Sequence, residues 1–60
     1  STPAPDLSLR NGSIVADGFN GKLQVYTVGG LLVKNASLAR GMYIVRGTDG
    51  KQNFVKKITF

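Results

Sequence analysis

The chain alternates short apolar stretches with turn residues and shows no helical period. Apolar and polar side chains alternate over Leu7-Ser8-Leu9-Arg10, and Asn11-Gly12 follows directly. Asn-Gly is among the strongest hairpin signals because both residues adopt positive φ easily. The pattern predicts a first hairpin over residues 7–17, with Ile14 and Ala16 on one face of its second strand.

A second hairpin is expected in the middle of the chain. Residues 21–28 alternate, with Val25 on one face and Tyr26 on the other. Gly29-Gly30 then supply the positive-φ positions of a tight turn, and residues 31–35 are expected to return antiparallel. Ahead of this hairpin lies a turn cluster whose aromatic residue, Phe19, is expected to fill one end of the core.

The strongest strand signal follows Gly41. Met42-Tyr43-Ile44-Val45 is apolar on both faces and ends at Arg46, so we expect a central strand that runs to about Thr48. The five residues before Gly41 are too few for a stable helix, and we expect a loop that places Leu38 in the core.

Asp49-Gly50 predicts another hairpin turn and a last strand over residues 51–60. Strict alternation would place Lys56 on the same face as Phe54 and Ile58. Either Lys56 extends its ammonium group to solvent at a sheet edge, or a β-bulge near Lys56-Lys57 turns Val55 inward instead. Both alternatives make this an edge strand that its lysines protect against uncontrolled pairing.

Six short strands joined by Gly, Asn and Asp turns predict an all-β fold, either a small antiparallel sandwich or a small barrel. Pro3 and Pro5 stand in a short segment of small and polar residues at the start of the chain. We expect residues 1–6 to be a linker and residues 7–60 to form one domain.

The composition indicates a marginal core. The chain has 60 residues and neither cysteine nor histidine, so neither a disulfide nor a cysteine–histidine zinc site can support it. A chain of this length buries only about 60% of the surface that its unfolded form exposes. We therefore expect stability to come from association, either with a parent domain or with a second copy, as a homodimer formed by strand pairing or exchange.

The charge pattern argues against nucleic acid as a partner. The net charge is +5, but the eight lysines and arginines are scattered, and only Lys56-Lys57 are adjacent. Nucleic-acid binding by a small barrel needs aromatic side chains along one face with basic neighbours. Tyr26 and Tyr43 lie instead among strand-forming apolar residues, where a core or interface role is expected.

No chemistry of an enzyme is indicated. Without histidine or cysteine, the usual general base and thiolate nucleophile are missing, and the three carboxylates, Asp6, Asp17 and Asp49, stand in linker or turn positions. We expect no catalytic residue, no metal site and no cofactor. Asn11-Gly12-Ser13 and Asn35-Ala36-Ser37 match the glycosylation pattern, but both also have turn composition.

Residues 21–60 resemble a known family in order and spacing. The resemblance is carried by three parts: the hairpin Val25-Tyr26 to Gly30 and Val33, the stretch Leu38-Ala39-Arg40-Gly41-Met42-Tyr43-Ile44-Val45, and the ending Lys56-Lys57-Ile58. Together these are similar to the C-terminal sorting domain (type A) of proteins exported by the type IX secretion system (Por secretion system) of Bacteroidetes-type bacteria.

The resemblance implies a fold and a function. Family members adopt a small Ig-like antiparallel β-sandwich, sit behind a larger N-terminal cargo domain, and direct it from the periplasm across the outer membrane. A sortase-like protease then commonly removes the domain, and the cargo is released to the exterior or attached to the cell surface. The implied partners are therefore the type IX translocon, the protease and the covalently linked cargo.

The resemblance also implies site residues. Those matching the family motif, mainly with structural roles, are Tyr26, Gly30, Val33, Gly41 and Tyr43. We expect the secretion machinery to recognise the last strand through Lys51, Phe54, Val55, Lys56, Lys57 and Ile58. The alternative function is an Ig-like adhesion or carbohydrate-binding module of a secreted protein.

Overall fold

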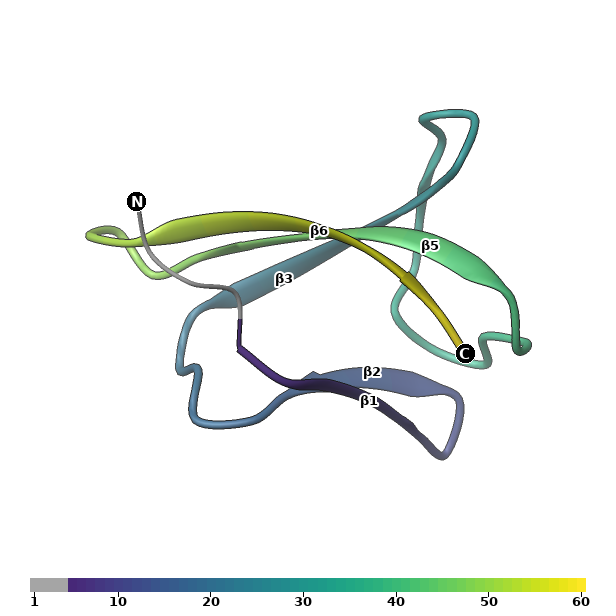
Figure 1. The fold of residues 1–60 in the computed structure, drawn as a ribbon, viewed down its shortest axis with the longest axis horizontal. Coiled ribbons are helices and arrows are strands. Elements are labelled where there is room, and N and C mark those ends of the chain that lie inside the picture. Colours follow the sequence, from purple (N-terminus) through teal and green to yellow (C-terminus); the bar gives the residue numbers. More distant parts are fainter. Residues whose placement is uncertain (1–4) are drawn as a thin grey trace.

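Two antiparallel sheets face each other in a computed structural model that describes residues 5–60 (Figure 1). The strands are β1 (Leu7–Arg10), β2 (Ser13–Ala16), β3 (Lys22–Thr27), β4 (Leu32–Val33), β5 (Met42–Thr48) and β6 (Asn53–Thr59). One sheet is the β1–β2 hairpin, and the other has the order β4-β3-β5-β6. This confirms the predicted all-β fold, a small antiparallel β-sandwich of six short strands. No helix in the described part of the chain is long and apolar enough to cross a membrane.

The linker prediction falls mostly on residues 1–4, which lie outside the described residues. At its end, the backbone carbonyl of Asp6 accepts a hydrogen bond of 2.9 Å from the N–H of Asp17. The β1–β2 ladder therefore continues by one pair beyond β1, and ordered backbone pairing reaches Asp6.

The first two hairpins turn differently. Asn11 and Gly12 have φ angles of 53° and 78°, which is the two-residue turn that the sequence predicts. In the β3–β4 hairpin only Gly30 has positive φ, so the expectation for Gly29 is wrong. The N–H of Gly30 donates to the carbonyl of Thr27, and the N–H of Thr27 donates to the carbonyl of Leu31. These two bonds close a three-residue loop with Gly30 in the left-handed position. The return strand is also shorter than predicted, at two residues.

The β5–β6 turn is centred one residue later than predicted. Thr48 pairs with Asn53, and the N–H of Asp49 donates to the carbonyl of Gln52, so the central residues are Gly50 and Lys51. The Asp49 carboxylate accepts hydrogen bonds from the N–H groups of Gln52, at 2.6 Å, and Lys51, at 2.9 Å. These two bonds lower the pKa of Asp49, because they stabilise its charged form.

The core lies between the layers and is built on one valine pair. Val25 of β3 pairs directly with Val45 of β5, and both side chains are 0% exposed. Ile14 of β2 packs on them from the other sheet. Full burial of one such side chain contributes about 1.5–3 kcal/mol, so these three residues together contribute an amount comparable to the net stability of a small domain. Leu38 also packs against this cluster from a loop, as predicted.

Two phenylalanines close one end of the core. Phe54 of β6 is 5% exposed and lies directly across from Gly47 of β5, whose missing side chain leaves room for the Phe54 ring. Phe19 meets Phe54 edge to face, with ring centroids 5.1 Å apart and an interplanar angle of 86°. This confirms the predicted role of Phe19.

Asn35 joins the two sheets through hydrogen bonds that sequence analysis did not anticipate. Its Oδ1 accepts from the N–H of Ile14 at 2.7 Å, and its Nδ2 donates to the carbonyl of Ile14 at 3.0 Å. The side-chain amide thus pairs with the exposed edge of β2 in the way a neighbouring strand would. The hydroxyl of Ser13 donates to the Asn35 carbonyl, and the N–H of Leu38 donates to Gly12. The Asn35 Nδ2 that glycosylation would modify already donates to the Ile14 carbonyl. The match of Asn35-Ala36-Ser37 to the glycosylation pattern is therefore better explained by the structural role of Asn35.

Gly47→Ala should destabilise the fold. A Cβ at this position would overlap the Phe54 ring, which is held by Phe19, and relieving such overpacking costs about 1–3 kcal/mol. Urea unfolding followed by circular dichroism measures the difference. Gly41→Ala is the matched control, because the nearest atom to its new Cβ would be 4.0 Å away in Tyr43. Equal stability of the two variants would contradict this packing.

Asn35→Ala should lower the melting temperature by about 10 °C, because two backbone groups of Ile14 lose their partners at a cost of about 2 kcal/mol. Calorimetry measures the shift. The control is Asn20→Ala, which alters an exposed asparagine in a neighbouring turn. If both variants melt at the same temperature, Asn35 does not hold the layers together.

Candidate recognition edge

β6 is the long edge strand of the four-stranded sheet. It pairs with β5 on one side, and no other described strand pairs with its second side. The N–H of Phe60 donates to the carbonyl of Gly41, and Asp49 and Gln52 are bonded at the other end of the ladder. Because antiparallel strands alternate their bonding direction, the even-numbered residues of β6 bond to β5. The N–H and C=O groups of four residues therefore point to the open edge, namely Asn53, Val55, Lys57 and Thr59.

The β5–β6 register settles the position of Lys56. Seven consecutive residue pairs run from Met42↔Thr59 to Thr48↔Asn53 without an interruption, so the β-bulge alternative is wrong. Lys56 pairs with Val45 on the inner face and is half-buried. Its aliphatic stem covers the inner face of the edge strand, as the snorkelling alternative predicts. The edge position of the strand is confirmed.

The structure divides the six residues predicted for recognition. Phe54 is a core residue, and Ile58 is half-buried against the core, so the domain's own packing already covers most of both side chains. Lys51 is exposed, but it lies in the turn that precedes β6. The three that gather on the open part of the strand are Val55, Lys56 and Lys57. Val55 is 66% exposed, because it lies on the outer face of the edge strand.

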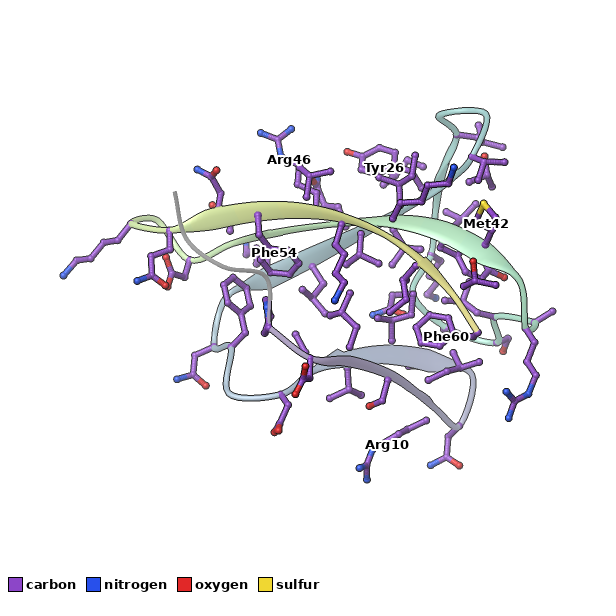
Figure 2. All side chains as sticks on the ribbon, in the orientation of Figure 1. Arg10, Tyr26, Met42, Arg46, Phe54 and Phe60 are labelled. Atoms are coloured by element: carbon purple, nitrogen blue, oxygen red, sulfur yellow. The ribbon has the colours of Figure 1, made fainter. Side chains whose placement is uncertain are left out.

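The two tyrosines of the family motif lie on opposite faces of the sheet. The hydroxyl of Tyr43 donates to the carbonyl of Ala39 at 2.6 Å, and its ring packs against the core. Tyr26 lies on the outer face, where its hydroxyl donates to Gln24 Oε1 at 3.3 Å. Figure 2 shows Tyr26 and Arg46 on the side of the sheet away from the β1–β2 hairpin, whereas Phe54 and Phe60 lie between the layers.

The other motif residues have local structural roles. Val33 pairs with Val25 and packs against the core from β4. Gly30 has a φ of 91° and closes the β3–β4 loop. Gly41 accepts the last backbone bond of the β6 ladder, from Phe60. These residues build the sheet on which β6 is held.

The four-stranded sheet carries cations and no carboxylate. Its strands contain four charged residues, Lys22, Arg46, Lys56 and Lys57. Arg46 pairs with Val55 across β5 and β6, so on the outer face it lies beside the open edge together with Lys57. The edge therefore combines unpaired backbone groups with a local positive potential.

The outer face is also apolar at its other end, which sequence analysis missed. Leu32 and Met42 are 56% and 44% exposed, and Val28 and Leu31 of the neighbouring loop are exposed as well. Tyr26 lies between Leu32 and Ile44 in the register. Period-two alternation finds the strand faces, but which of two apolar faces is covered depends on where the β1–β2 hairpin docks.

Within residues 5–60 there is no group of three or more histidine, cysteine, aspartate or glutamate side chains that could hold a metal ion. The three aspartates lie apart from the β6 edge: Asp6 and Asp17 flank the β1–β2 hairpin, and Asp49 caps the β5–β6 turn. The chemistry that the edge offers is thus backbone hydrogen bonding, apolar contact and positive charge.

Comparison of the chain with models of protein families, with curated proteins and with solved structures gave no match.

Proposed function

We propose that this chain is a C-terminal sorting domain (type A) that directs a larger, covalently linked cargo protein through the type IX secretion system. The observation that carries the proposal is the open edge of β6, with Val55, Lys56 and Lys57 at its centre. A receptor strand that pairs with such an edge gains affinity from main-chain bonds and specificity from the side chains beside them. Recognition of this kind requires no catalytic group, metal or cofactor.

The residues that match the family motif support the proposal because they hold the sheet, while the lysines near the end of the chain lie on its edge strand. Tyr43, Val33 and Gly41 pack, pair or bond within the sheet that supports β6. Lys57, by contrast, is exposed on the outer face, and Lys56 is half-buried on the inner face at the edge of the sheet. A secretion signal needs this combination of a rigid support and a charged, accessible strand.

The proposal assigns a sequence of locations and partners. The domain passes through the periplasm with its cargo, binds the type IX translocon, and reaches the outer membrane surface or the exterior. A sortase-like protease then separates domain and cargo. Because the β1–β2 ladder begins with the bond between Asp6 and Asp17, the cut is expected before Asp6.

A second candidate function is an Ig-like adhesion or carbohydrate-binding module. It is favoured by the outer face, where the half-buried Tyr26 lies between Leu32 and Ile44, because an aromatic ring that is partly open to solvent beside apolar residues suits sugar rings. Binding to immobilised polysaccharide that Tyr26→Ala abolishes would support this candidate over sorting.

The sorting function is tested with a fluorescent passenger fused ahead of residues 1–60 in a bacterium that has the type IX system. Lys57→Glu should lower the passenger in the medium severalfold, because it reverses the charge at the open edge. Lys51→Glu is the matched control, with the same change of charge in the adjacent turn, and it should be exported normally. Circular dichroism of both purified domains checks that they remain folded.

Continued export after deletion of residues 51–60 would overturn the proposal. Equal loss in the Lys57→Glu and Lys51→Glu fusions would show that net charge matters and the edge does not.

A further inference from the structure

We propose that the open edge of β6 binds an acidic β-strand of its receptor, in antiparallel orientation, with two adjacent carboxylates opposite Lys56 and Lys57. The inference rests on the proposed function, which it deepens by stating the chemistry of the partner. It follows from three features of the edge: its free backbone groups, its alternating faces and its uncompensated charge.

The backbone groups set the register of a docked strand. Val55 and Lys57 direct their N–H and C=O groups away from β5, as do Asn53 and Thr59 at the ends of the strand. An added antiparallel strand forms its paired bonds with these residues. Its side chains opposite them project to the outer face, and those in between project to the inner face.

The faces set the composition of that strand. On the outer face it meets Val55, which is 66% exposed, and Lys57, with Arg46 one strand behind. On the inner face it meets Lys56 between Phe54 and Ile58. Apolar residues opposite Val55, Phe54 and Ile58, and carboxylates opposite both lysines, give the pattern Val-Glu-Glu-Val-Ile when read antiparallel to residues 58–54.

Charge complementarity selects this occupant over a second copy of the chain. The strands of this sheet contribute four cations and no carboxylate. Symmetric pairing of β6 with the β6 of a second copy brings four lysines together. If the pairing is centred on Lys56 or on Lys57, the two copies of that lysine lie directly opposite each other, and this repulsion destabilises the ladder. Carboxylates opposite the two lysines convert this repulsion into attraction.

The test uses the 60-residue chain and the synthetic peptide Thr-Val-Glu-Glu-Val-Ile-Thr, with Thr-Val-Lys-Lys-Val-Ile-Thr as the matched peptide. Titration followed by amide NMR should show binding of the acidic peptide only, with the largest shifts at residues 53, 55, 57 and 59. Raising the salt concentration from about 0.05 M to about 0.5 M should weaken it, because the Debye length falls to a few ångströms.

Three variants separate charge from backbone pairing. The double variant Lys56→Glu, Lys57→Glu should lose affinity for the acidic peptide by about tenfold or more and gain affinity for the lysine peptide. Val55→Pro removes one N–H from the open edge and none from the β5 ladder, so it should abolish binding while the fold persists. Val55→Thr, which keeps that N–H, should bind the acidic peptide, and thermal unfolding confirms that each variant is folded.

Equal binding of both peptides, or full binding by a folded Val55→Pro chain, would overturn the inference. So would a dimer formed through β6 that excludes the peptide. If export of the passenger depends on Lys57 but the acidic peptide does not bind, the stated partner chemistry is wrong and the sorting function stands. If the peptide binds but export is indifferent to the edge, the sorting function fails.

Discussion

The pairing of β5 with a strand on each side is the constraint on which the rest of this structure depends. Val45 meets Val25 on one side and Lys56 on the other, so a single residue of β5 fixes both the centre of the core and the position of the edge lysine. A shift of either ladder by one residue would turn every side chain of the shifted strand to the other face. The position of the open β6 edge is therefore a consequence of how the core is packed.

The β1–β2 hairpin covers one face of the four-stranded sheet, and side-chain and loop contacts must hold it there because, within residues 5–60, no strand pairing joins the two sheets. The two-stranded β1–β2 hairpin has few bonds of its own, and Asn35 ties its free edge to the loop that follows β4. This is an economical solution for a chain that has no cysteine with which to form a disulfide. It protects the β2 edge with a side chain and leaves β6 as the long edge open to another molecule.

Local signals in the sequence predict much of this fold. Asn11-Gly12 forms the predicted turn, residues 42–48 form the predicted strand, and Phe19 reaches the core end. Features that depend on contacts between distant segments cannot be predicted from such local signals. The turn at Gly50-Lys51 belongs to a register that places Phe54 opposite Gly47, and that fit is a property of the two paired strands, not of the turn residues alone.

The candidate site shows the same limit. Alternation places Lys56 inward or outward only if the strand is known to be regular, and the uninterrupted β5–β6 ladder decides it. Phe54 and Ile58 belong to the core because of what packs over them from distant segments. The Asn35 clamp spans 21 residues to Ile14, and asparagine in a loop is too common for its sequence to reveal that partner.

Hydrogen exchange along β6 tests the central claim, that this strand is held by β5 on one side and open on the other. The account predicts alternation: slow exchange at the amides of residues 54, 56 and 58, which bond to β5, and fast exchange at 53, 55 and 57, which face the open edge. Uniform protection along the strand, or protection with the opposite phase, would contradict it.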